Sequence, residues 1–256
     1  MIYIYDGTWD GLMCLIYRTA EDGVVPEAIL RNGAEKQGLL FESARVENNS
    51  NIAEATASLL RKRVSGPTWG DAWFALLSGD DGADMALWHL LERVWRRGRR
   101  AELDLADPCI DAVRRAARHT GGEYEKYLGV TRFKDVGGIL YAQIEPGCDV
   151  LPLLAGHFSR RLTDRGWVLH DLRRARAAVC RGADWYVTDM DPSQAPRIGS
   201  GEQRYQDLWR EFYRATTTRE RLNYKVQRTH MPRKYWKHLV ETPGELHGDS
   251  LASGGA

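Results

Sequence analysis

Residues 131–145 read TRFKDVGGILYAQIE, and at this point the hydrophobic pattern changes from a helical period to a period of two. Residues 131–136 and 139–145 both have the alternation that is typical of β-strands. Gly137-Gly138 joins the two runs, and paired glycines supply the positive φ angles that a tight hairpin turn requires. The stretch therefore predicts a β-hairpin that opens a strand-rich region after a helical N-terminal half.

Three more runs of strand-like composition follow the hairpin. They are separated by turns rich in arginine and glycine, and they read WVLHDL (167–172), ARAAVC (175–180) and DWYVTDM (184–190). We expect them to complete an antiparallel sheet of about five strands. One short helix should interrupt this sheet, with Asp149 as its N-terminal cap and Pro152 in its first turn.

The part of the chain before the hairpin predicts a strand–helix–strand–helix start that is followed by a helical bundle. Residues 2–5 are apolar and predict a strand, and Thr8 can cap the helix after it. Residues 38–47 predict a second strand, and residues 49–51 can cap a second helix. Helices and antiparallel strands that are segregated along the chain in this way predict an α+β fold.

The C-terminal segment, residues 204–241, predicts a long amphipathic helix. Its aromatic and apolar residues recur at the spacing of one helix face, while charged residues occupy the other face. Large aromatic residues at helical spacing usually belong to a core, so we expect Trp209 and Phe212 to pack against the sheet. Pro232 then breaks the helical pattern.

Length and composition describe an ordinary globular protein, with 256 residues, 43% hydrophobic and 28% charged. We expect an N-terminal part (1–130) and an antiparallel-sheet part with a C-terminal helix (131–241), which together form one compact unit, and a disordered tail (242–256). The first residues lack a signal-peptide pattern, and no apolar run approaches the roughly 18 residues of a membrane span. The sequence therefore predicts a cytoplasmic protein that has no membrane contact.

The sequence predicts neither a metal nor a cofactor. The four cysteines are widely separated and form no C-x-x-C pair, which argues against a zinc site, an iron–sulfur cluster or a redox dithiol. The chain also has no G-x-x-x-x-G-K-[ST] loop and no G-x-G-x-x-G motif after a strand. Nucleotide hydrolysis and dinucleotide binding therefore have no support in the sequence.

Two basic runs in the C-terminal half have the composition of nucleic-acid-binding surfaces. Residues 160–181 hold seven arginines against two aspartates, and residues 219–237 hold seven Lys and Arg against one glutamate, interleaved with Tyr and Trp. Basic groups contact phosphates and aromatic rings stack on bases, whereas the alternative is a surface of weak ion pairs around core aromatics. The candidate nucleic-acid-binding residues are Arg160, Arg161, Arg174, Arg210, Arg214, Arg219, Arg221, Arg228, Arg233, Lys234 and Tyr235.

Three residues are candidates for catalysis, although their spacing forms no known motif. Glu145, His157 and Asp171 have side chains suited to acid–base chemistry. Their spacing does not place them on one face in the way that an H-E-x-x-H motif would. Structural roles are also available, such as an ion pair of Asp171 with Arg173 or Arg174. Both interpretations stay open at the level of the sequence.

Three stretches carry a family resemblance. They read YIYDGTWDGL (3–12), ILYAQIEPGCDVLPLLAGHFSRRL (139–162) and RYQDLWREFYRATTTRERLN (204–223). Together they resemble a family of bacterial proteins that are described as DNA-metabolism or DNA-repair proteins and carry a domain of unknown function. Two departures are Cys148, where the family pattern has a histidine, and His170, where it has an aromatic residue. A ligand or general-base role for a histidine at 148 is therefore in doubt here.

The resemblance implies a functional context. Members are typically encoded beside a radical-SAM protein proposed to act in DNA repair, and some are fused to a uracil-DNA-glycosylase-like domain. This chain shows neither an iron–sulfur cysteine triplet nor a glycosylase domain, so it resembles the stand-alone form.

We therefore expect an accessory protein of DNA metabolism or DNA repair. It should bind DNA, including single-stranded or damaged DNA, through arginine and aromatic surfaces, and act with a radical-SAM repair enzyme. One alternative is an enzyme that acts on DNA or a modified nucleotide through Glu145, His157 and Asp171. Another alternative is a protein adaptor that makes no direct contact with DNA.

Overall fold

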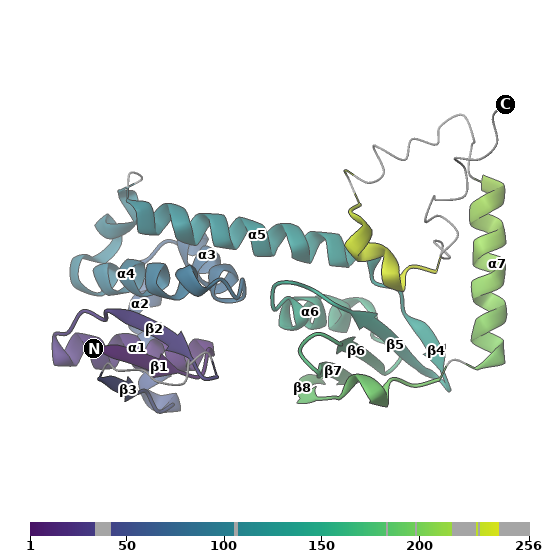
Figure 1. Cartoon of the computed structure of the whole chain (residues 1–256), viewed down its shortest axis with the longest axis horizontal. Helices are drawn as coiled ribbons and strands as arrows, with labels where there is room; N and C mark the ends of the chain where they lie inside the picture. Colours follow the sequence, from purple (N-terminus) through teal and green to yellow (C-terminus); the bar gives the residue numbers. More distant parts are fainter. Residues whose placement is uncertain are drawn as a thin grey trace. The chain divides into compact units, whose positions relative to one another are not determined.

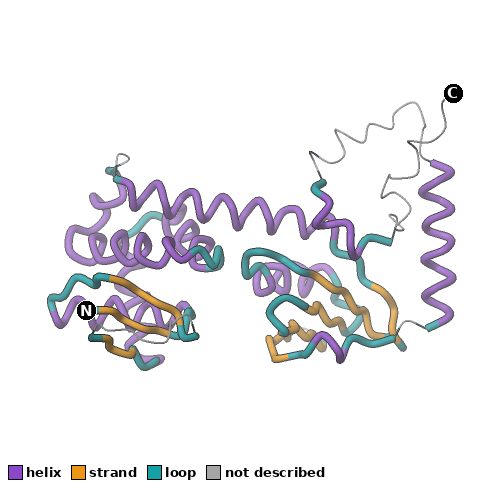
Figure 2. Tube along the Cα trace, viewed as in Figure 1, coloured by secondary structure: helices purple, strands orange, loops and turns teal. Residues whose placement is uncertain are grey.

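The computed structural model describes residues 1–33, 42–104, 107–182, 184–197, 199–216, 229 and 231–240. The chain divides into two units (Figure 1). The first unit contains residues 1–122 and 147–149, and the second contains residues 123–146 and the chain from Val150 onward. Helices and strands occur in both units (Figure 2), so the predicted α+β class is confirmed.

The first unit contains a three-stranded parallel sheet. Its central strand β1 (Ile2–Tyr5) pairs with β2 (Ala28–Arg31) on one side and with β3 (Ser43–Arg45) on the other. All four residues of β1 are buried, as expected for a central parallel strand that is covered on both faces. The strand predicted at residues 2–5 is confirmed. The sequence pattern does not predict β2, because four residues are too few to establish a period.

The strand predicted at residues 38–47 is present in part. The structure has β3 within this range, whereas residues 38–41 lie outside the described residues.

Side-chain caps begin the two helices that follow β1 and β3. The Thr8 hydroxyl accepts a hydrogen bond from the Gly11 amide at 3.0 Å at the start of α1 (Trp9–Asp22). Asn49 caps α2 (Ser50–Arg63) by accepting hydrogen bonds from the amides of the second and third residues after it. Both caps agree with the sequence prediction, because capping depends only on residues that are close together in the chain.

The rest of the first unit is helical. It contains α3 (Gly66–Leu76), α4 (Asp81–Arg97), the 3₁₀ helix η1 (Gly98–Leu103) and the first part of α5 (Pro108–Val130). The core between these helices, α1 and the sheet is apolar and is centred on leucine and tryptophan side chains. Within it, the indole nitrogen of Trp88 donates to the Thr19 hydroxyl at 2.9 Å, so the polar atom of the largest buried side chain is satisfied.

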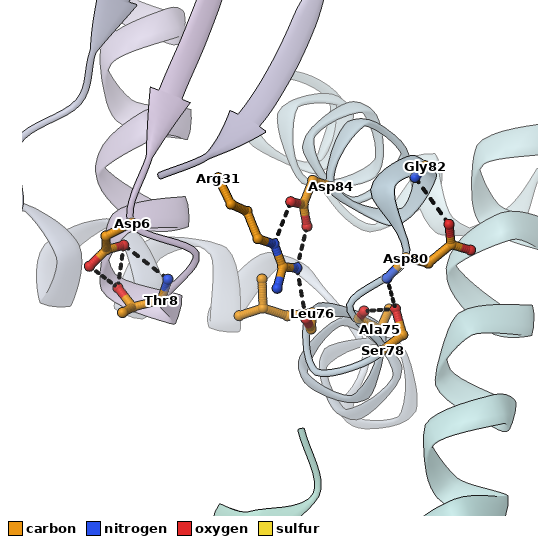
Figure 3. A network of polar contacts seen from close by, with 9 residues as sticks. All are labelled: Asp6, Thr8, Arg31, Ala75, Leu76, Ser78, Asp80, Gly82 and Asp84. Atoms are coloured by element: carbon orange, nitrogen blue, oxygen red, sulfur yellow. Dashed lines mark hydrogen bonds and ion pairs between the residues drawn. The ribbon is translucent and has the colours of Figure 1, made fainter. Parts of the chain in front are cut away.

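A polar network joins β2 to α3 and α4 in the first unit (Figure 3). Arg31, the last residue of β2, donates from Nε and Nη2 to the two carboxylate oxygens of Asp84 at 2.7 and 2.6 Å. Nη2 also donates to the carbonyl of Leu76 at the end of α3, at 2.9 Å. The Asp84 carboxylate, through its hydrogen bonds to the guanidinium, raises the pKa of Arg31. This bidentate pair therefore links three secondary-structure elements of the unit.

The second unit contains a five-stranded sheet with the order β4-β5-β6-β7-β8. Its strands are β4 (Lys134–Val136), β5 (Ile139–Ile144), β6 (Trp167–Asp171), β7 (Arg176–Arg181) and β8 (Asp184–Asp189). β4 and β5 form the predicted hairpin, with Gly137 at φ 62° and Gly138 at φ 92° in its turn. The paired glycines are required there because side-chain-bearing residues rarely adopt positive φ.

The expectation of a purely antiparallel sheet is wrong at one pair, because β5 and β6 run parallel. The reason lies between them, where α6 (Leu151–Arg161) forms the crossover that a parallel connection needs. A further correction concerns the start of α6. The capping position is Val150, one residue after the predicted Asp149, and the Val150 side chain makes no capping hydrogen bond, although Pro152 does lie in the first turn.

After the sheet come the 3₁₀ helices η2 (Pro192–Gln194) and η4 (Arg233–His238), with helix α7 (Ser200–Thr216) between them. The polar face of α7 makes its contacts with the rest of the unit: the Asp135 amide donates to Glu202 at 3.0 Å, and Arg210 donates to the carbonyl of Val240 at 3.1 Å. The expectation that Trp209 and Phe212 pack against the sheet is wrong, since they are 45% and 58% exposed. Among the described residues, no helix is long and apolar enough to cross a membrane.

Candidate nucleic-acid interface

Glu145 follows β5 directly, and side chains of η4 hold its carboxylate. Lys237 donates from Nζ to Oε1 at 2.6 Å, and His238 donates from Nε2 to the same oxygen at 2.9 Å. Burial raises the pKa of the Glu145 carboxyl, but the hydrogen bonds from Lys237 and His238 outweigh burial and lower the pKa below its ordinary value. Glu145 therefore anchors η4 within the second unit.

Asp171 is the last residue of β6 and is fully buried. Its Oδ1 accepts hydrogen bonds from the backbone amides of Arg173 at 3.0 Å and Arg174 at 3.2 Å. Its Oδ2 accepts one from the Arg174 guanidinium at 3.1 Å, and the same guanidinium nitrogen donates to the carbonyl of Pro146. Burial raises the pKa of the Asp171 carboxyl, although Arg174 acts in the opposite direction. Asp171 thus shapes the turn between β6 and β7.

The structure gives His157 and His170 neighbours other than these two carboxylates. His157 is half-buried in α6, and its ring meets Phe158 edge-on with the centroids 5.2 Å apart. His170 is fully buried, with Nε2 donating to the carbonyl of Met190 at 2.9 Å and Nδ1 contacting the Tyr141 hydroxyl at 2.7 Å. In the part of the chain that the structure describes, no group of three or more His, Cys, Asp or Glu is placed to hold a metal ion.

Two of the candidate phosphate-binding arginines make contacts within the protein. Arg174 is held by Asp171, as described above, and is largely buried. Arg210 donates from Nη1 to Asp207 at 2.6 Å and from Nε to the carbonyl of Val240. Each guanidinium therefore has a structural partner that a phosphate would have to replace or share.

The segment around η4 is more buried than its composition predicts. The Lys234 ammonium donates to the buried carboxylate of Glu123 at 2.8 Å. Tyr235 is 5% exposed, and its ring packs edge-on against Tyr127 with the centroids 5.3 Å apart. Nucleic-acid contact by Tyr235 stays a prediction, but in this structure its ring belongs to the core of the second unit. Sequence spacing alone does not distinguish a buried ring from an exposed one.

Among the candidate arginines whose side chains the structure describes, three are exposed. Arg160 and Arg161 lie in the last turn of α6, and Arg233 is the first residue of η4. These side chains can reach a phosphate backbone without first leaving a buried site. Arg219, Arg221 and Arg228 lie outside the described residues, as does the side chain of Arg214.

The apolar face of α7 is the feature that sequence reasoning assigned to the core and that the structure exposes. Its exposed fractions are 73% for Tyr205, 54% for Leu208, 45% for Trp209 and 58% for Phe212. A groove of about 580 Å³ adjoins this face and is also lined by Arg132. The long helix predicted over residues 204–241 is present in the described residues only as α7, since residues 217–228 lie outside them. The amphipathic pattern could not predict which face the rest of the unit would cover.

Acidification is expected to loosen η4. Burial lowers the pKa of the His238 imidazole below its ordinary 6.5; Lys237 and Lys134 act in the same direction, and Glu145 opposes them. The folded-state pKa values of His238 and Glu145 are both lowered. The two groups therefore contribute to stability at pH values above their unfolded-state pKa values, about 6.5 for His238 and about 4.3 for Glu145. This contribution is lost as the pH falls through their lower folded-state pKa values.

Hydrogen exchange of the η4 amides tests this expectation, after correction for the intrinsic pH dependence of exchange. Between about pH 7 and about pH 5 the opening free energy should fall, because His238 becomes protonated. The fall should be only about 1 kcal/mol, because solvent screens the partly exposed pair. A Glu145→Gln variant should already be loosened at neutral pH and should change more between the two conditions, because Glu145 is the group that opposes the lowering of the His238 pKa. Equal protection of the wild-type amides at both pH values would contradict the proposed role of these groups.

Comparison with known proteins gives one family match. A family model described as a domain of unknown function, DUF4130, matches residues 81–241. The matched segment begins at α4 and includes the whole five-stranded sheet, α7 and η4. A comparison with curated proteins found no match. Because the matched segment is more than half of the chain, this protein belongs to the DUF4130 family.

Proposed function

We propose that this protein is an accessory factor of DNA metabolism or DNA repair that binds DNA through its second unit and acts with a separate radical-SAM repair enzyme. The observation that carries the DNA-binding part is the surface of this unit. It exposes Arg160, Arg161 and Arg233 to solvent, and it also exposes aromatic rings along α7. Exposed guanidinium groups suit phosphates, and exposed rings suit bases. The resemblance to DNA-metabolism proteins supports the proposal that the partner is a radical-SAM repair enzyme.

The pair Arg160 and Arg161 offers the sharpest test of phosphate contact. Both lie in the last turn of α6, so charge reversal to glutamate should leave the fold intact apart from a small helix-dipole effect. We expect the double variant Arg160→Glu/Arg161→Glu to bind duplex DNA at least about tenfold more weakly. Each lost phosphate contact should also reduce the slope of log affinity against log salt by about 0.9.

A matched control exists in the first unit. Arg61 and Lys62 are exposed and lie in the last turn of α2, so Arg61→Glu/Lys62→Glu makes the same change of net charge at an equivalent helical position. Fluorescence anisotropy with a labelled duplex at several salt concentrations measures both variants. DNA binding that does not depend on salt, or an equal loss in both double variants, would contradict a specific contact by α6.

A further inference from the structure

The groove beside α7 has a size and a lining that suit a planar ring. It has a volume of about 580 Å³ and is lined by Arg132 and Phe133 on one side and by Tyr205, Gln206 and Trp209 of α7 on the other. This volume lies within the roughly 300–1,000 Å³ of small-ligand pockets. We propose that the groove binds an unpaired nucleobase of single-stranded or locally melted DNA, an inference that rests on the proposed DNA-binding function.

Two aromatic rings of α7 provide the stacking surface. Tyr205 and Trp209 are four residues apart on the helix, so their side chains lie on the same face, and both are substantially exposed. The indole of Trp209 also contacts the ring of Phe212, with ring centroids 5.8 Å apart and planes tilted by 32°. Exposed rings held beside a groove are the usual platform for bases of single strands, because every base has a π face.

Arg132 adds a planar cationic group at the edge of the groove. Its Nη1 donates to the carbonyl of Gly129 at 2.7 Å, so the last turn of α5 holds the guanidinium in place. A positioned guanidinium can stack on a base or contact the phosphate next to it.

The polar rim of the groove favours a neutral base over a phosphate. Gln206 is nearly buried, and its amide donates to Glu202 at 3.0 Å. The Glu202 carboxylate also accepts the Asp135 amide, so it is a fixed negative charge in the groove wall. That charge disfavours phosphate inside the groove, while amide and carboxylate oxygens can accept hydrogen bonds from the N–H groups of bases, including the ring N3–H of thymine. The same charges make the groove a poor site for an aliphatic side chain of a protein partner.

The experiment compares two probes that differ only in their bases. One is a labelled oligothymidylate of about twelve nucleotides, within the roughly 4–16-nucleotide site size of single-strand-binding modules. The other is an abasic oligomer with the same number of phosphates. We expect the full-length wild-type chain to bind the oligothymidylate about tenfold more tightly than the abasic oligomer, because one base–ring stack contributes about this factor.

The variant Trp209→Leu keeps an apolar side chain and removes the indole ring. It should lose most of the preference for the oligothymidylate, and its affinity for the abasic oligomer should equal that of the wild type. Leu208→Ala is the matched control, because Leu208 is similarly exposed on the same helix but carries no ring, and it should keep the wild-type preference.

The remaining outcomes separate the two proposals. Equal wild-type affinity for both oligomers, or a preference of undiminished size in Trp209→Leu, would overturn the nucleobase site and leave DNA binding intact. Absence of binding to either oligomer would overturn the DNA-binding function, and the nucleobase site with it. A Trp209→Leu variant that changes only the oligomeric state in size-exclusion chromatography would assign this face to a second copy of the chain and likewise overturn the inference.

Discussion

Replacing Arg31 with leucine is expected to lower the free energy of unfolding by about 3–5 kcal/mol. Asp84 is buried and receives two hydrogen bonds from the Arg31 guanidinium (Figure 3). Without Arg31 its carboxylate would stay in a low-dielectric interior without the charge that compensates it, which is the most damaging way to break a buried pair. The loss of the bond to the Leu76 carbonyl adds to this effect. Urea unfolding followed by circular dichroism measures the change.

Two controls isolate the cause. The double variant Arg31→Leu/Asp84→Leu should recover much of the loss, because it leaves no buried charge. Arg18→Leu makes the same substitution in an exposed pair with Asp22, where both side chains are about half exposed, and it should change stability by less than about 1 kcal/mol. A similarly small effect of Arg31→Leu would show that the Arg31–Asp84 pair does not hold the first unit together.

Replacing Asp171 with alanine is expected to destabilise the second unit by about 3–5 kcal/mol. The change removes the acceptor for two backbone amides and for the Arg174 guanidinium, all at a position with no solvent exposure. Buried donors that lose their acceptor incur most of their desolvation penalty. A catalytic role for Asp171 predicts the opposite result, namely a normally stable protein without activity.

Two further variants, Asp171→Asn and Asp164→Ala, provide the comparison for the stability of Asp171→Ala. Asp171→Asn keeps an oxygen at the position of Oδ1, which accepts both amides, so its loss should be smaller than that of the alanine variant. Asp164→Ala removes an exposed carboxylate from the same unit and should change stability by no more than about 0.5 kcal/mol. Equal stability of Asp171→Ala and the wild type in thermal unfolding would refute the structural role.

Local structure was the part that could be predicted from the sequence. The hairpin at Gly137-Gly138 and the caps at Thr8 and Asn49 depend on dihedral preferences and hydrogen bonds between residues that are at most a few positions apart. The same holds for the strands after residue 166, whose alternation is visible in the chain itself.

The candidate site could not be predicted in the same way, because its roles depend on partners distant in sequence. Lys234 meets Glu123 across 111 positions, and Lys237 meets Glu145 across 92. These pairings give Lys234, an expected phosphate ligand, and Glu145, a candidate catalytic residue, partners within the protein, although the Lys234 side chain stays more than half exposed. The residue type shows that such a position carries a charged side chain. Only the fold determines whether that side chain contacts solvent or another side chain.

By itself, the sequence determined the α+β class, the hairpin, the caps and the amphipathic character of α7, since all of these follow from local periodicity and backbone chemistry. Tertiary structure alone decided that β5 and β6 run parallel, through the crossover helix α6. It also decided that α7 turns its polar face, with Glu202 and Arg210, inward and leaves Trp209 beside a groove. An amphipathic pattern specifies that a helix has two faces, and the long-range contacts of the fold select which one is buried.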